Sequence, residues 1–136
     1  MPPYRPRGYN PSMSSLLLIH PEATERNDIA LRLRSNDFEV ECATGGFHAL
    51  SLLEKHRYDL LLIMGDMDDM PAIEVISLCR NVKSKEELPI LYCDKDAHQK
   101  EIIEAFEFGA NDFLAKTDQF NLLLEKLKKL KRFVKR

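Results

Sequence analysis

Short apolar runs alternate along this chain with longer stretches in which apolar residues recur every three or four positions. Residues 16–19 and 60–63 are wholly apolar, which is typical of strands buried on both faces of a sheet. Residues 38–42 alternate apolar with polar side chains and indicate a strand nearer the sheet edge. Two further runs, 89–93 and 113–115, complete a set of five predicted strands.

Each predicted strand is followed by a segment with helical periodicity. These segments are 22–35, 47–53, 73–79, 102–109 and about 118–134. Gly109 supplies a natural stop for the fourth helix. Strict alternation of strands and helices with short connections predicts a parallel sheet that is covered by helices on both faces. The fold class is therefore expected to be α/β, doubly wound, with five parallel strands.

The composition indicates one globular domain. A length of 136 residues and an apolar fraction of 44% suit a single sizeable core. The longest uninterrupted apolar run, residues 60–64, is far shorter than the roughly 20 residues of a membrane span, and the N-terminus does not have the apolar stretch of a secretory signal. Cys42, Cys79 and Cys93 lie far apart without C-x-x-C spacing, so we expect reduced, mostly buried thiols in a cytoplasmic protein.

Charge is distributed unevenly along the chain. Residues 13–125 hold all 22 acids against 11 bases, whereas residues 126–136 hold 7 bases and no acid. Three explanations of the basic end stay open: interaction with the helix dipole, contact with nucleic acid or anionic lipid (which the acidic body would repel), and a connector into a partner or output domain. We expect a proline-rich, flexible arm over 1–13 and one domain over 14–134.

Ligands of a doubly wound sheet bind at the carboxyl ends of its strands. The residues that follow the predicted strands include His20, Pro21, Met64, Asp94 and Lys116. The sequence contains neither G-x-G-x-x-G nor G-x-x-x-x-G-K-[ST], and no nucleophile–base pair can be assembled from these strand ends. We therefore expect no enzymatic activity and no cofactor. His20 lacks neighbours at metal-ligand spacing and is interpreted as a structural histidine.

Three segments resemble response-regulator receiver domains. Residues 58–63, followed by a loop and residues 73–75, resemble the family's third strand and third helix. Residues 109–116 (GANDFLAK) are similar to its fifth-strand signature, and residues 43–50 (ATGGFHAL) to its second strand-to-helix turn. The resemblance covers about 15–133 and implies a flavodoxin-like fold with strand order 2-1-3-4-5. It also implies phosphoryl transfer from a histidine kinase to an aspartate in the presence of Mg²⁺.

The site residues depart from the pattern of that family. Where the family has two adjacent acids, a phosphate-accepting aspartate and a Ser or Thr, this chain has His20 and Pro21, Met64 and Asp94. Lys116 matches the family's lysine, although Thr117 replaces the proline that follows it. Phe113 stands at the position of the family's switch aromatic.

These departures predict that phosphorylation is lost. Met64 has no carboxylate nucleophile, and neither Pro21 nor Met64 offers Mg²⁺ a side-chain oxygen ligand. The charge of Asp94 would repel a dianionic phosphoryl group. We expect instead a fixed ion pair between Lys116 and either Asp94 or Asp66, with no bound metal.

Residues 66–70 (DMDDM) form an acidic loop. The loop lacks the distal glutamate of an EF-hand, so we expect it to be solvated and flexible. A weak cation site, and a substitute phosphoacceptor at Asp66 or Asp68, stay open as alternatives. Met67 and Met70 are predicted to offer adaptable apolar contacts to a partner, whereas Met64 is expected to pack in the core.

Together these features predict a phosphorylation-independent pseudo-receiver that binds protein partners in bacterial two-component signalling. The expected surface is formed by the last two helices and the last strand, the face that receiver domains commonly use, and it is also the expected site of a homodimer. Two alternatives stay open: a receiver still phosphorylated on an acid of residues 66–69, and a sensor of a small ligand or metal at His20, Asp94 and Lys116. Nucleic acid is not expected as a partner.

Overall fold

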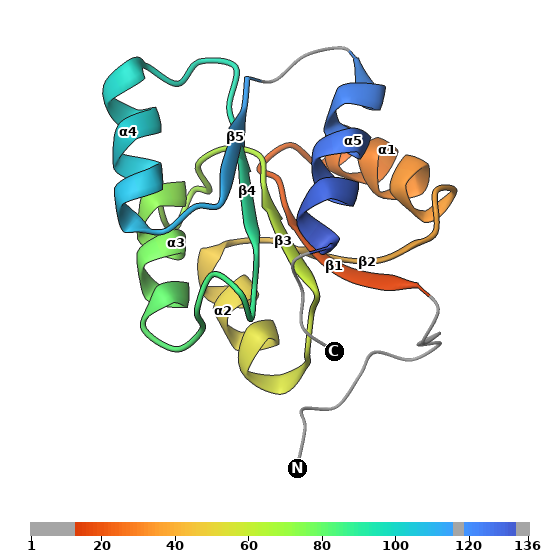
Figure 1. Ribbon diagram of the computed structural model, residues 1–136, viewed down its shortest axis with the longest axis horizontal. Helices are drawn as coiled ribbons and strands as arrows, with labels where there is room; N and C mark the ends of the chain where they lie inside the picture. Colours follow the sequence, from red (N-terminus) through yellow and green to blue (C-terminus); the bar gives the residue numbers. More distant parts are fainter. Residues whose placement is uncertain (1–12, 116–118, 133–136) are drawn as a thin grey trace.

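Five parallel strands form one sheet in the order β2-β1-β3-β4-β5, with helices on both faces (Figure 1). The computed structural model describes residues 13–115 and 119–132. Its elements are β1 (Ser14–Ile19), α1 (Ala23–Arg34), β2 (Phe38–Ala43), α2 (Gly46–Lys55), β3 (Leu60–Ile63), α3 (Ala72–Arg80), β4 (Ile90–Cys93), α4 (Gln99–Phe108), β5 (Asp112–Leu114) and α5 (Phe120–Lys131). This is the predicted flavodoxin-like α/β fold with the predicted strand order.

The burial of each strand follows its place in the sheet. β1 lies between β2 and β3, with Leu16 paired to both Val40 and Leu60. Its apolar residues and all of β3 are fully buried, because helices cover both faces of these central strands. β2 lies at the sheet edge and is only partly buried at four of its six positions. The two apolar runs and the alternating run were therefore assigned correctly.

Side chains of successive strand residues point into two separate apolar cores. Leu17 and Ile19 belong to the core beneath α2, α3 and α4, whereas Leu16 and Leu18 belong to the core beneath α1 and α5. Figure 1 shows the same division of the helices between the two sides of the sheet. The carboxyl ends of the strands consequently open between the two helical layers.

Element bounds differ slightly from the predictions. β1 begins at Ser14, two residues before the apolar run, and β5 covers 112–114 instead of 113–115. The predicted arm lies outside the described residues except for its last residue, as do Lys116, Thr117 and the end of the last predicted helix. Within the ranges 13–115 and 119–132, no helix is both long and apolar enough to cross a membrane.

The three cysteines are free thiols, as predicted. Cys79 and Cys93 are buried, and Cys42 on the edge strand is half-buried. Burial raises the pKa of the Cys79 thiol to about 11. Cys79 therefore stays protonated and unreactive at neutral pH.

Candidate functional site

The predicted site residues converge at the carboxyl edge of the sheet. A hollow of about 450 Å³ is lined by His20, Pro21, Met64, Asp66 and Asp94, among others. They meet there because parallel strands all end at the same edge. Lys116 lies outside the described residues, so its ion pair with Asp94 or Asp66 stays a prediction. We call this hollow the strand-end site.

Met64 directly follows β3 and is drawn into the core. Its backbone N–H donates to the carbonyl of Ile19 at 2.8 Å, which fixes the residue beside the end of β1. Its side chain is 7% exposed and packs in the core beneath α1 and α5. The end of β3 therefore presents a packed thioether, in agreement with the core role expected for Met64.

His20 is buried and connects the end of β1 to the start of α1. Its Nδ1 accepts the backbone N–H of Glu22 at 3.1 Å, and its Nε2 lies 3.2 Å from Oε2 of Glu25. Because Nδ1 accepts an N–H, the ring proton lies on Nε2, on the side of the Glu25 carboxylate. The carbonyl of His20 also accepts Nη1 of Arg26 at 2.8 Å. These contacts agree with the interpretation of His20 as a structural histidine.

Asp94 is held by two hydrogen bonds. Its Oδ2 accepts the hydroxyl of Tyr92 at 3.1 Å, and its Oδ1 accepts the backbone N–H of Asp96 at 3.0 Å. Burial, and after it the Asp94 carboxylate, raise the pKa of Tyr92 above its ordinary range. The ring of Tyr92 packs edge-on against Phe113 at 5.6 Å between centroids. Asp94 is thus connected to the switch-aromatic position through Tyr92.

Tyr92 is a site residue that the sequence analysis missed. It precedes Asp94 by two positions at the end of β4. Residues two apart on a strand point to the same face. That spacing was the available signal for a contact between the two side chains.

The three acids of loop 66–70 are exposed, as expected of a solvated loop, and two of them also hold backbone groups of neighbouring helices. Oδ1 of Asp66 accepts the backbone N–H of Ala72 at 2.7 Å. The carboxylate of Asp69 accepts the N–H groups of Gly46 and Phe47 at 2.9 and 3.1 Å. The loop is therefore fastened to the first turns of both α3 and α2, where backbone N–H groups have no partner inside the helix.

Met67 and Met70 were predicted to offer apolar contacts to a partner, and this prediction is wrong. The two residues exchange backbone hydrogen bonds at 3.0 and 3.2 Å, which closes a tight turn. Their side chains are buried in the core beneath α2, α3 and α4. They pack inside this domain and are not exposed for contact with a partner.

The strand-end site is strongly acidic. The described residues that line it include five carboxylates and one lysine, namely Glu22, Asp66, Asp94, Asp96, Glu101 and Lys95. Charge of this sign repels a phosphoryl dianion. In the described part of the chain, however, no three His, Cys, Asp or Glu side chains are grouped closely enough to hold a metal ion.

The comparison with known families agrees with the fold. The response regulator receiver domain model matches residues 16–128. The chain belongs to the response-regulator receiver family. Chemotaxis protein CheY-3 of Vibrio cholerae is 30% identical over 119 residues, which cover 85% of this chain and 89% of CheY-3. This receiver domain is therefore a signalling module of the two-component type.

Other similar proteins are longer, or share mainly the fold. Transcriptional regulatory protein AfsQ1 of Streptomyces coelicolor is 30% identical over 112 residues, and the match covers 82% of this chain but 48% of AfsQ1. The receiver thus spans about half the length of AfsQ1. A two-component response regulator from Clostridium difficile superposes with a TM-score of 0.81 at 21% identity, covering 88% of this chain and 97% of that one. TrrA from Thermotoga maritima, solved with Mg²⁺ and BeF, superposes with a TM-score of 0.78 at 25% identity. The match covers 87% of this chain and 99% of that one.

Proposed function

We propose that this receiver domain is a pseudo-receiver, whose conformation and partner binding do not depend on phosphorylation of an aspartate. The observation that carries the proposal is Met64, which occupies the end of β3 and is 7% exposed. A thioether cannot form an acyl phosphate, because it has no carboxylate nucleophile. The side chain also fills the apolar space beside the strand end.

The remaining acids support the same conclusion. Asp66 and Asp69 both use their carboxylates to hold backbone N–H groups at helix starts. A phosphoryl group on Asp69 would require one of its two hydrogen bonds to break. Asp68 is exposed and is the acceptor that a test must exclude.

The contacts around Asp94 support a fixed conformation. Asp94 holds the Tyr92 hydroxyl, and Tyr92 packs on Phe113 of β5. Phe113 lies on the edge strand between α4 and α5 in the sequence. We propose that this chain of contacts keeps the surface of α4, β5 and α5 in one arrangement without a phosphoryl signal.

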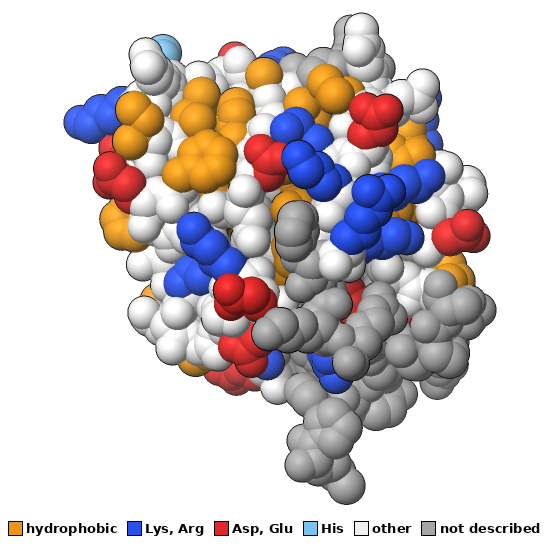
Figure 2. All heavy atoms as spheres, viewed as in Figure 1, with side chains coloured by type: hydrophobic (Ala, Val, Ile, Leu, Met, Phe, Trp, Pro, Cys, Tyr) orange, Lys and Arg blue, Asp and Glu red, His pale blue; other side chains and the backbone are white. Residues whose placement is uncertain are grey.

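That surface is the proposed interaction face, defined here by α4, β5 and α5. Ile103, Phe106 and Leu122 are 49%, 41% and 37% exposed. Figure 2 shows apolar side chains gathered over α4 beside Lys and Arg side chains over α5. Lys126 on α5 pairs with Asp112 on β5 at 3.0 Å. We propose that the face joins two copies of the receiver in the bacterial cytoplasm.

The charges of the face suit a two-fold pairing. We place the two-fold axis beside β5, so that α5 of one copy lies against α4 of the other and the contact is reciprocal. α5 carries lysines and no acid after Glu125, whereas α4 carries Glu101, Glu104 and Glu107. Opposite charges therefore meet around an apolar centre. The basic end of the chain is proposed to lead into a further, output domain.

Incubation of the intact chain with acetyl phosphate and Mg²⁺, followed by intact mass measurement, tests the proposal. We expect the mass to stay unchanged. A mass increase of one phosphoryl group that hydroxylamine removes would contradict it, because hydroxylamine cleaves acyl phosphates. Asp68→Asn and Asp66→Asn would then identify the acceptor, with Asp96→Asn as the matched acid outside the loop.

A further inference from the structure

Apolar side chains lie along the adjoining sides of α2 and α3, which cover the same side of the sheet (Figure 1). A Cβ on Gly46, in the first turn of α2, would lie 2.7 Å from Cβ of Met70 and 3.2 Å from Cγ2 of Val75. The start of α2 therefore lies directly against α3. On the same side of α2, Leu50 and Leu53 are half-buried against the core beneath α2, α3 and α4.

The two helices are in register along this side. All strands are parallel, so α2 and α3 run in the same direction. Leu53 follows Gly46 by seven residues, which is nearly two full turns and about 10 Å along the helix. Val82 follows Val75 by the same interval, and its N–H continues the last turn of α3 by donating to the carbonyl of Cys79 at 3.1 Å. Leu53 and Val82 therefore lie level with each other.

Three side chains of this surface are exposed. Phe47 is 66% exposed, Leu78 is 37% exposed and Val82 is 75% exposed. Leu50 and Leu53 add half-buried apolar surface on α2. Contiguous apolar surface from two elements is typical of a contact site, whereas single exposed apolar residues are not. We call these five residues the α2–α3 strip.

Exposed acids border the α2–α3 strip. Glu54 lies four positions after Leu50, and Glu74 lies four positions before Leu78, so each is one helical turn from an apolar residue. Asp69 lies beside the first turn of α2, where its carboxylate accepts two backbone N–H groups. All three acids are exposed.

The basic residues of α2 and α3 are directed away from the strip. Lys55 follows Gly46 by nine residues, which places it on the opposite side of α2. Arg80 donates to the carbonyl of Gly109 and to Oδ1 of Asn111, both at 2.8 Å, and is held beside the end of α4. The charge contributed by these two helices at the strip is therefore negative.

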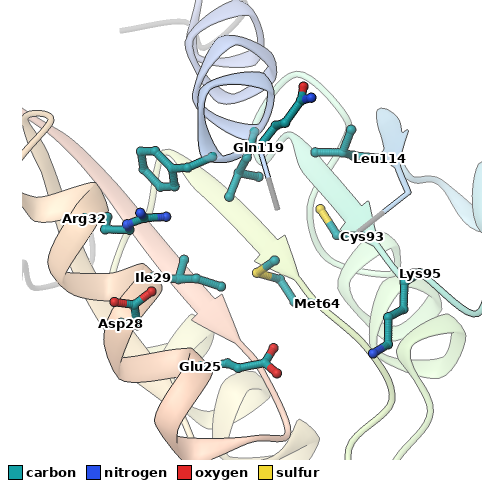
Figure 3. Close-up of a pocket in the computed structure, with 11 residues that line it drawn as sticks. Glu25, Asp28, Ile29, Arg32, Met64, Cys93, Lys95, Leu114 and Gln119 are labelled. Carbon is teal, nitrogen blue, oxygen red and sulfur yellow. The ribbon is translucent and has the colours of Figure 1, made fainter. Parts of the chain in front are cut away.

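The side of the sheet that α1 and α5 cover is different. A hollow of about 320 Å³ lies there, and exposed charged side chains of both signs surround its apolar floor (Figure 3). Asp28 and Arg32 lie one turn apart on α1. Mixed charge of this kind gives a partner no preferred sign, whereas charge of one sign beside the α2–α3 strip favours a partner of the opposite sign.

We infer that the α2–α3 strip binds a basic amphipathic helix of another protein. Apolar side chains spaced i, i+3, i+4 and i+7 on that helix cover the strip from Phe47 to Val82. Its Lys and Arg side chains lie beside Glu54, Asp69 and Glu74, and an acidic helix is repelled by the same three carboxylates. This inference goes beyond the proposed function and does not depend on the loss of phosphorylation.

Titration of the ¹⁵N-labelled chain with a synthetic helix of leucine and lysine, followed by amide NMR, tests this inference. The peptide has about 18 residues, which is long enough for a helix, with leucine at the spacing given above. We expect saturable shifts at residues of α2 and α3, with a Kd below about 100 µM. A peptide with glutamate in place of every lysine should bind at least about tenfold more weakly.

Matched variants separate the apolar and the charged contributions. Phe47→Ser and Val82→Ser are each expected to weaken binding at least about fivefold, whereas Leu31→Ser, at a residue 62% exposed on α1, should leave the Kd unchanged. Glu74→Gln should weaken binding about threefold, with Asp28→Asn on α1 as its control.

The inference is wrong if the lysine peptide does not saturate by about 1 mM. It is also overturned if the shifts map to α4, β5 and α5, or if the glutamate peptide binds as well as the lysine peptide. Equal Kd values for Phe47→Ser, Val82→Ser and Leu31→Ser would likewise exclude the strip as the binding surface.

Discussion

Gly109 has a left-handed backbone conformation and lies directly against the side chain of Arg80. Its φ is +122°, and a Cβ there would lie 2.5 Å from Cγ of Arg80. Arg80 in turn donates to the carbonyl of Gly109 and to Oδ1 of Asn111, both at 2.8 Å. The same Asn111 oxygen accepts the N–H of Ile90 at 2.9 Å. The GAN sequence at 109–111 therefore fixes the ends of α3 and α4 against the start of β4.

Comparison with Gly65 separates the effect of backbone strain at Gly109 from the effect of its contact with Arg80. Gly65 has a similar φ of +128°, but a Cβ there would meet only Pro21 at 3.5 Å. We expect Gly65→Ala to lower the free energy of unfolding by about 1–2 kcal/mol through backbone strain, and Gly109→Ala by about 2–4 kcal/mol through strain and displacement of Arg80. Urea unfolding measures both. Equal losses would show that the Arg80 contact adds nothing.

At the scale of elements, α2 is capped by a residue from another segment. Its own N-cap residue, Gly45, has no side chain to hydrogen-bond the first turn. Asp69 supplies that carboxylate from the loop between β3 and α3. The backbone N–H groups of Gly46, then Phe47, lower the pKa of Asp69 below its ordinary value. The loop and the helix therefore stabilise each other.

The decrease in stability that follows removal of this cap is expected to depend on pH. Asp69→Ala should lower the thermal unfolding midpoint at pH 7, because the carboxylate that holds α2 is absent. A carboxyl group whose pKa is lower in the folded state stabilises that state at pH values above its unfolded-state pKa of about 3.9. This stabilisation is lost as the pH falls through the folded-state pKa. The difference from the native chain should therefore shrink below about pH 4.

Asp68→Ala is the matched control for the cap. Asp68 is the exposed neighbour in the same loop, and no side-chain hydrogen bond of Asp68 is seen among the described residues. Its removal should leave the thermal midpoint within about 2 °C of the native value at both pH values. Equal effects of the two substitutions would contradict the assignment of Asp69 as the cap.

The sequence was most informative where structure is decided locally. The apolar run 60–63 indicated a central strand because burial on both faces requires apolar residues at every position. The contacts of the loop 66–70 with α2 were not predicted, because they join residues that are distant in sequence. Asp69 binds backbone groups 22 and 23 residues away, and no local pattern of acids and methionines indicates such a partner.

At the scale of the whole molecule, the topology explains why residues far apart in the sequence meet at the predicted site. Every strand is parallel, so residues after β1, β3 and β4 meet at one edge. The absence of a carboxylate nucleophile at Met64 also follows directly from its thioether side chain. The hydrogen bond of Asp94 to Tyr92 depends on side-chain packing, which the sequence pattern does not specify.

The interaction face gives a prediction about assembly. Phe106 on α4 is 41% exposed, so Phe106→Asp should raise the dissociation constant of the dimer at least about tenfold with little effect on folding. Sedimentation velocity over a concentration series measures this change. Leu31→Asp is the matched control, because Leu31 is 62% exposed on α1, away from the face. A native chain that stays monomeric, or equal effects of both substitutions, would contradict the proposed dimer.

The central claim is that the end of β3 no longer accepts a phosphoryl group. Amide NMR of the ¹⁵N-labelled chain during titration with Mg²⁺ and beryllofluoride, a mimic of phosphorylated aspartate, tests it most directly. TrrA, which has been solved with Mg²⁺ and BeF, is the positive control. We predict no saturable shifts near Met64 and Asp94. Saturable shifts there that Asp66→Ala or Asp68→Ala abolishes would contradict the account and establish a displaced phosphoacceptor.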